Sequence, residues 1–251
     1  MKKFIFFLCL FALWTKTGHA QTNFRFGFQV SPSFSWMDSD DKQINSNGSN
    51  LGLKLGARGE FFFAERYAIV SGLGFHFNAG GTMLYETGGV FWPKSDLSSE
   101  DYRVLPAEVD LKYSIRYVEV PLSLKLLTPD IGRDLKAFVE IPAFFIGFRS
   151  QARGDISKAG NLDTNDEDIR KDVLPLSLSW GAGAGGEYIL RGSSGGDTNI
   201  LFGVFYQQGF TDVTTNKALK YVDDGQGGIK EEAEDSKAII RAITIHLGVM
   251  F

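Results

Sequence analysis

The sequence predicts an all-β fold: an eight-stranded antiparallel up-and-down transmembrane β-barrel with four long extracellular loops and short periplasmic turns. Two patterns predict it. Apolar and polar residues alternate along each candidate strand, so one face of the strand is apolar and the other carries small, polar and charged residues. The connections between these strands are alternately short and long, which is typical of barrels in an outer membrane.

Residues 1–20 are expected to form a secretory signal peptide, which leaves a barrel domain over residues 21–251. Two lysines open the chain, the apolar run after them is too short to span a bilayer, and small residues precede the expected cleavage site after Ala20. The single cysteine, Cys9, lies in this run. The mature chain therefore has no disulfide, thiol nucleophile or cysteine metal ligand.

Charge and hydropathy narrow the classes of function. The chain has 26 basic and 30 acidic residues, and removing Lys2, Lys3 and Lys16 with the signal peptide leaves 23 against 30, a net charge of about −7. This acidic balance argues against nucleic acid as a partner. No run of about 18 apolar residues follows the signal peptide, so strands and not helices are expected to cross the membrane.

The first candidate strand, residues 24–36, shows the alternation most clearly. Four phenylalanines and Trp36 share one face, and Arg25, glycine, glutamine and serines share the other. A soluble sandwich would turn the apolar face inward, whereas a membrane barrel turns it outward to lipid. The same alternation recurs over residues 51–63, 67–78, 174–190, 199–210 and 238–251.

Residues 118–126 alternate cleanly, but Leu111, Tyr113 and Ile115 upstream have the opposite parity. A membrane strand needs only about 9 to 11 residues, so we expect the upstream part to stand above the bilayer, beyond a bulge near Tyr117.

Residues 135–149 are apolar on both faces. A carboxylate on the lipid face is unfavourable, so Glu140 is placed inside the barrel, and Pro142 marks a candidate second bulge. The residues placed outside are Ala137, Val139, Ile141 and Phe145.

Short and long connections alternate strictly. The short ones are residues 64–66, 128–134 and 191–198, and the long polar ones are 37–50, 79–110, 150–172 and 211–237. A soluble barrel has no reason to alternate them, so the pattern favours the outer membrane. The terminal Phe251 fits this interpretation as a barrel-assembly signal.

Four segments carry a family resemblance: "YVEVPLSLKL" at 117–126, "SWGAGAGGEY" at 179–188, "YQQGFTDV" at 206–213 and "ITIHLGVMF" at 243–251. In their order and over nearly the whole mature chain, the sequence resembles the PorT-type outer-membrane β-barrel ("porin") family of the Bacteroidota. The resemblance implies a fold and a location, the outer membrane of a Gram-negative cell. Many members have no assigned activity, and one founding member is an accessory to type IX secretion and gliding.

Mixed charge is expected inside the barrel. The charged residues on the inward parity are Arg25, Lys54, Arg58, Glu60, Glu119, Lys125, Glu140 and Glu187. Glu119 or Glu140 could serve as an acid or base, but side chains fill an eight-stranded interior and buried charges persist when paired. An ion-paired plug without an open pore is the preferred interpretation.

The remaining motifs point to no strong chemistry. Gly181 to Gly186 satisfies GxGxxG but lies within a strand, so its glycines are expected to make room for bulky lumenal side chains. His76 and His246, the histidines of the mature chain, are placed on strands that are not neighbours and share no expected site. We therefore expect no enzyme activity and no cofactor.

The polar loops leave alternatives open. Residues 161–170 are rich in Asp and Glu but fail the EF-hand pattern at Asp168 and Leu174, so a solvated acidic loop is preferred over a weak cation site. The acidic segment 211–237 is interpreted in the same way. In the second long loop, three aromatic residues either form a recognition patch or pack over the barrel mouth: Phe91, Trp92 and Tyr102.

The sequence thus predicts a non-enzymatic outer-membrane protein whose loops or rim bind a partner. Expected contacts are outer-membrane lipid, lipopolysaccharide and the barrel-assembly machinery during insertion. The alternatives are an accessory component of a secretion or gliding complex, a barrel hydrolase, and a porin for small solutes.

Overall fold

The computed structural model of this chain describes residues 24–131, 133–192 and 197–251. The expected signal peptide lies outside these residues. Among the described residues, no helix is long and apolar enough to cross a membrane.

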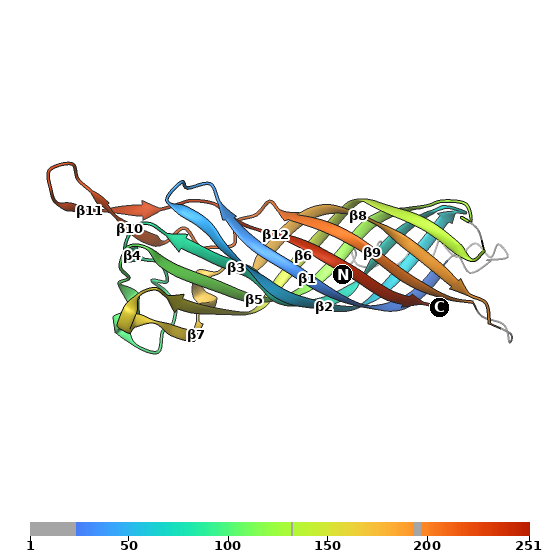
Figure 1. Ribbon diagram of the computed structural model, residues 1–251, viewed down its shortest axis with the longest axis horizontal. Coiled ribbons are helices and arrows are strands. Elements are labelled where there is room, and N and C mark those ends of the chain that lie inside the picture. The colour runs from blue at the N-terminus through green and yellow to red at the C-terminus, as the bar shows by residue number, and fades with distance from the viewer. Residues whose placement is uncertain (1–23, 132, 193–196) are drawn as a thin grey trace, which may run out of the picture.

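Eight long strands of the described chain close into one antiparallel ring (Figure 1). Each pairs with its neighbours in chain order, and β1 pairs with β12 to close the ring. The ring strands are β1 (Phe24–Ser39), β2 (Ile44–Ala64), β3 (Tyr67–Tyr85), β5 (Val109–Leu127), β6 (Leu135–Ser157), β8 (Leu176–Leu190), β9 (Thr198–Gly209) and β12 (Ala238–Met250). The predicted fold class, an eight-stranded up-and-down barrel, is confirmed.

The alternating pattern gives the ring an apolar outer band. Phe28 of β1 is 57% exposed and Leu51 of β2 is 64% exposed, and outward side chains on the other six ring strands are exposed in the same way. Since exposed aromatic and aliphatic side chains on one closed band are stable only against lipid, this band is the membrane-spanning surface.

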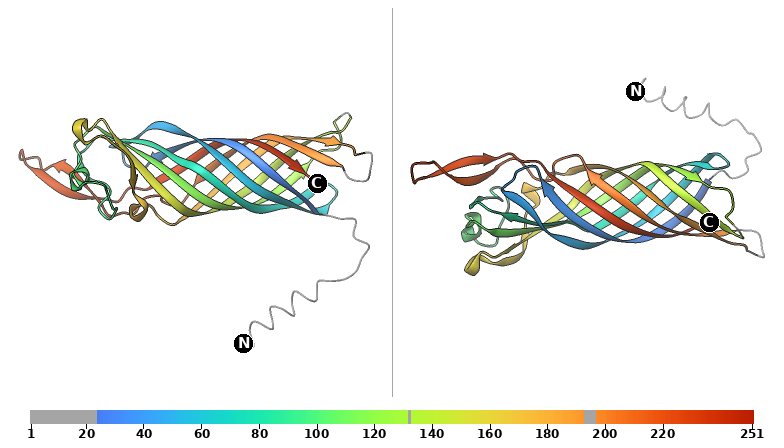
Figure 2. Two further views of the ribbon diagram at one scale, coloured as in Figure 1. Left: turned by 90° about the horizontal axis from the view of Figure 1, so that it is seen from below. Right: turned by 45° about the horizontal axis from the view of Figure 1, so that its top comes forward.

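Five of the eight ring strands are longer than predicted at one end. Most of residues 37–50, expected as a loop, instead complete β1 and begin β2, and β3, β5 and β6 extend likewise. We call this the loop end and the opposite end, with the shorter connections, the turn end (Figure 2). The loop end adds β4 (Gly89–Val90), β7 (Thr164–Asp168), β10 (Ala218–Asp223), β11 (Ile229–Glu234) and the short 3-10 helices η1 (Glu100–Arg103), η2 (Gly160–Leu162) and η3 (Arg170–Asp172).

The interior changes character along the barrel axis. Within the apolar band it holds the charged residues beside a small apolar cluster that includes Phe138 and Phe205. Inside the loop-end extension the buried cluster is apolar, with Met37, Met83 and Leu111 fully buried. Outside the lipid, the extension has water on its outer face, so its apolar residues turn inward. The extension of β1, β2, β3, β5 and β6, with the loops that cover it, is therefore a packed unit with a core of its own.

The predicted bulge near Tyr117 is present, but its extra residues lie in the neighbouring strands. The β3–β5 register shifts between His76 and Ala79, and the β5–β6 register shifts between Arg116 and Tyr117. β5 itself keeps one inward parity from Leu111 through Lys125, and only the chemistry of its inward residues changes. The expectation that Leu111, Tyr113 and Ile115 stand beyond the membrane band agrees with the structure.

The candidate bulge at Pro142 is also present, because the β6–β8 register shifts between Glu140 and Ala143. Glu140 lies inside and Val139 and Ile141 outside, as expected. The placement of Phe145 was wrong: the bulge reverses the parity, so Phe144 faces outward while Phe145 lies under the Lys54 ammonium, 5.0 Å from ring centroid to Nζ.

Candidate functional site

The lumen near the turn end holds a buried ion network. Lys125, which has no exposed surface, places its Nζ 2.7 Å from Glu60 Oε1 and also contacts Glu187. Arg25 Nη2 lies 2.7 Å from Glu60 Oε2 and 3.1 Å from Glu187 Oε1. Two cations thus share two carboxylates, which offsets the loss of hydration of all four groups.

The network continues toward the loop end. Arg58 pairs with Glu60 at 3.0 Å and with Glu140, which also accepts a hydrogen bond from Ser123 Oγ at 2.8 Å.

Four residues from Arg58 on β2, toward the loop end, Lys54 Nζ lies 2.8 Å from Glu119 Oε2. All eight charged residues predicted on the inward parity face the lumen, and they comprise four cations and four carboxylates. The charges balance, so the lumen holds a neutral plug.

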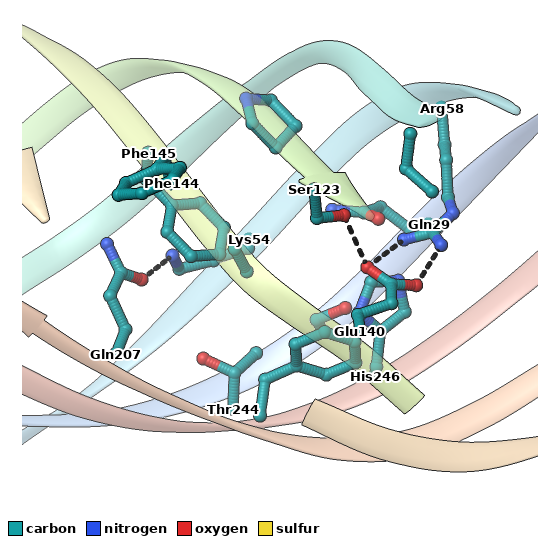
Figure 3. A pocket seen from close by; sticks show the side chains of 15 residues that line it. Gln29, Lys54, Arg58, Ser123, Glu140, Phe144, Phe145, Gln207, Thr244 and His246 are labelled. Carbon is teal, nitrogen blue, oxygen red and sulfur yellow. Dashed lines mark hydrogen bonds and ion pairs between the residues drawn. The ribbon is translucent and has the colours of Figure 1, made fainter. Parts of the chain in front are cut away.

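The two histidines line different cavities. His246 borders a cavity of about 40 Å³ beside Thr244 and Gln29 (Figure 3), and its ring lies 4.9 Å from that of Phe205. His76 borders a second cavity of about 20 Å³ and approaches Glu119, with Nδ1 3.3 Å from Oε1. Each cavity has room for only a few water molecules. The two imidazoles therefore do not form one site.

The glycines of the GxGxxG motif lie within β8, as predicted. A Cβ on Gly183 would lie 2.2 Å from the Phe205 ring, and one on Gly185 would lie 2.8 Å from Phe138 Cζ. These glycines make room for large lumenal side chains. Gly181 and Gly185 also permit close approach of the β9 backbone, since a Cβ on Gly181 would lie 2.0 Å from the Tyr206 carbonyl oxygen and one on Gly185 2.1 Å from the Phe202 carbonyl oxygen.

Carboxylates of the acidic segment 161–170 accept hydrogen bonds from neighbouring groups of the protein. Glu167 accepts hydrogen bonds from the Ser98 backbone N–H at 2.7 Å and from Thr164 Oγ1 at 2.8 Å. Burial raises the pKa of the Glu167 carboxyl, but these hydrogen bonds and the one from the Ser98 hydroxyl more than offset it and hold the pKa below its usual value. Within the described residues, no three His, Cys, Asp or Glu side chains are grouped to hold a metal ion.

The aromatic residues of the second long loop pack over the barrel mouth. Phe91 and Trp92 are buried, and Tyr102 packs against the same core. Trp92 donates its indole N–H to the Tyr113 hydroxyl at 3.2 Å, and the Tyr85 and Tyr113 hydroxyls lie 3.0 Å apart. Of the two predicted roles, the packing role is the one that the structure shows.

A groove of about 780 Å³ opens at the loop end. Loop 86–108, residues 159–162 and the β10–β11 hairpin enclose it. Apolar side chains dominate its lining and include Val104, Leu105, Leu162, Tyr221, Val222 and Ile229. Val104 and Ile229 are more than half exposed, so the groove presents apolar surface to solvent.

This groove was not predicted, because the many acidic residues of segment 211–237 favour a solvated loop over a hairpin. The signal was present in "DDGQGG" at 223–228, where an Asp-Gly step between two strand-like runs is a strong hairpin pattern. Gly225 and Gly227 have φ of 73° and 82°, which is the left-handed backbone that such a turn requires.

The comparison with protein families decides the assignment. The family described as "Outer membrane protein beta-barrel domain" matches residues 19–215. The chain belongs to this family. Its location in the outer membrane follows, in agreement with the apolar band of the ring. A search of curated proteins finds no match.

Solved structures of outer-membrane barrels are similar to this family member only at the level of the fold. Neisserial surface protein A has a TM-score of 0.42 and 10% identity, covering 91% of this chain and 96% of its own. OprG from Pseudomonas aeruginosa has a TM-score of 0.36 and 12% identity, covering 91% and 94%. The outer membrane protease OmpT from Escherichia coli has a TM-score of 0.42 and 8% identity, covering 94% and 99%.

Proposed function

We propose that this outer-membrane barrel is a non-enzymatic binding protein whose loop end holds a partner outside the cell. The observation that carries the proposal is the open apolar groove on a packed, membrane-distal extension. A groove whose walls are fixed before binding loses little conformational entropy when it is filled. Long connections lie on the extracellular side in barrels of this kind, which gives the orientation used here.

Two features of the lumen support a non-enzymatic role. Glu119 and Glu140, the carboxylates considered as acid and base, are each held by a cation, Lys54 and Arg58. The two histidines line separate cavities and do not face a common space. The charged lumenal residues therefore serve to fill and stabilise the barrel, and the function belongs to the loop end.

The experiment is site-specific photo-crosslinking in cells at native expression. A photoreactive amino acid at Val104 or Ile229, both exposed at the groove, should give crosslinks to a distinct partner. The matched control is Ile131, which is also more than half exposed but lies in a connection at the turn end. Equal crosslinks at all three positions, or none at the groove, would contradict the proposal.

The assignment to the PorT-type barrels of the Bacteroidota, and with it a place in a secretion or gliding machinery, is a second proposal. It is supported by the four ordered segments described above, of which "YVEVPLSLKL" lies in β5 and "ITIHLGVMF" ends the chain. Native purification distinguishes the two. Stoichiometric recovery of secretion or gliding proteins favours the accessory role, and recovery of the barrel alone as a heat-modifiable monomer argues against it.

A further inference from the structure

β11 is an unpaired sheet edge at the far tip of the molecule. The loop-end sheet has the order β11–β10–β4, and within the described residues β11 pairs only with β10. Figure 1 shows that this hairpin projects beyond the rest of the loop end, so nothing drawn there covers its outer edge. Residues 229–233 are all exposed.

The register identifies which backbone groups are free. The Tyr221 N–H donates to the Gly88 carbonyl at 2.8 Å, away from β11, so Tyr221 and its β11 partner Glu231 form a non-hydrogen-bonded pair. The Asp224 N–H donates to the Gly228 carbonyl at 3.0 Å, so Asp224 and Gly228 form a hydrogen-bonded pair. Hydrogen-bonded and non-hydrogen-bonded pairs alternate along the hairpin, and both observations give the same alternation. Ile229, Glu231 and Ala233 therefore direct their N–H and C=O groups to the open edge.

The edge is held in place before any partner arrives. Glu234 at the base of β11 is buried and accepts the Ser236 N–H at 2.9 Å. On β10, Lys220 Nζ contacts Asp41 Oδ2 at 2.7 Å, which ties the hairpin to the β1–β2 turn. An ordered edge with free donors and acceptors is the surface on which extended peptides add a strand.

The negative charge of the β10–β11 hairpin determines which kind of strand can be added to its edge. Residues 218–235 contain six acidic side chains and two lysines, and one lysine, Lys220, is already paired with Asp41. A second copy of β11 would add three more glutamates and only one lysine beside these side chains, and the net like-charge repulsion disfavours it. The same charges suppress unspecific pairing with neutral strands. A strand carrying Lys or Arg is the complementary one.

We propose that β11 binds an extended, basic polypeptide segment of another protein as an added antiparallel strand. Ile229 belongs both to the open edge and to the lining of the apolar groove, so an apolar side chain of that segment can enter the groove. This inference rests on the proposed binding function and specifies its partner class.

The test uses the full chain in lipid nanodiscs and a short synthetic peptide of alternating lysine and valine. Ala233→Pro removes one outward N–H without touching a bond to β10, because edge strands accept proline there. It should weaken binding at least tenfold, whereas Ala233→Ser, which keeps the N–H, should bind as the parent does. The double variant E231Q/E232Q should bind more weakly and lose most of the salt dependence.

A peptide methylated on alternate backbone nitrogens separates strand addition from simple charge attraction. It keeps every charge but loses its donors, and it should not bind. Equal binding of the methylated peptide, or of Ala233→Pro, would overturn the proposal. Self-association of the chain that Ala233→Pro abolishes would assign the edge to a second copy and also overturn it. If groove crosslinks persist while the peptide fails, only this inference falls and the binding function stands.

Discussion

At the scale of single residues, the lumenal charges make the sharpest prediction about stability. Lys125→Met removes a fully buried cation and leaves Glu60 and Glu187 short of positive charge. We expect a loss of roughly 3–5 kcal/mol in the free energy of unfolding, the usual result when one partner of a buried pair is removed. Urea unfolding in lipid vesicles measures it.

The control for that substitution is Lys171→Met. Lys171 pairs with Asp96 at 2.7 Å, but both side chains are more than half exposed. The unfolding free energy of this variant should not change measurably, since water screens such a pair. A Lys125→Met variant as stable as the parent would show that the lumenal network does not hold the barrel together.

Parity predicts a residue's side only where the strand is regular. Glu140 was placed correctly because a carboxylate is unfavourable against lipid, but Phe145, five residues on, was not. The bulge at Pro142 intervenes, and a phenylalanine is compatible with both environments, so the residue itself could not reveal the change of side. Its position under the Lys54 ammonium depends on packing between β2 and β6, which the periodicity of one strand does not reveal.

At the scale of elements, loop 86–108 closes the mouth of the extension through Trp92. Trp92→Ala should lower the free energy of unfolding of the loop end by about 3–5 kcal/mol, the usual range for truncating a buried aromatic side chain. Because Trp92 packs in the loop end, protease cleavage within this loop should increase. The heat-dependent shift of the membrane barrel in gel electrophoresis should stay the same. Val104→Ala, at an exposed position of the same loop, should cleave as the parent does.

The base of the β10–β11 hairpin should respond to pH. Burial, together with the neighbouring Asp212 and Asp41 carboxylates, raises the pKa of Glu234 above its usual value despite the hydrogen bonds from Ser236. The native state therefore holds this proton more tightly than the unfolded chain. The stabilisation is complete below the ordinary pKa and is lost as pH rises through the raised one.

Glu234→Gln removes that dependence. The backbone N–H groups of Val213 and Ala238 donate hydrogen bonds beside the foot of this hairpin, to the Ala238 carbonyl and to Asp212 Oδ1. At pH 7 these amides should exchange more slowly in the variant, by up to about tenfold for each unit by which the pKa of Glu234 is raised. At pH 4 the protection factors of variant and parent should converge. Glu231→Gln, on the exposed part of β11, serves as the control and should change neither value.

At the scale of the whole molecule, sequence periodicity was sufficient for the ring but not for its length. Outward aromatic faces identify the membrane-spanning part, such as residues 24–34 of β1. Beyond the lipid the strands continue with small and polar residues outside, as in 44–50 of β2, and no period separates such a strand from a loop. The extension and its groove depend on packing between loops far apart in the chain.

The neutral, side-chain-filled lumen predicts that the intact barrel conducts no steady current. Its described cavities, of about 40, 30 and 20 Å³, are far smaller than a continuous aqueous path requires. Planar-bilayer recording of the parent should therefore show a silent membrane. Replacing both Lys54 and Glu119 by alanine removes both members of one ion pair, together with the contact that His76 makes with Glu119. Intermittent openings in this double variant, with none in the parent, are the expected result. Steady conductance in the parent would assign the lumen a transport role and remove the reason for placing function at the loop end.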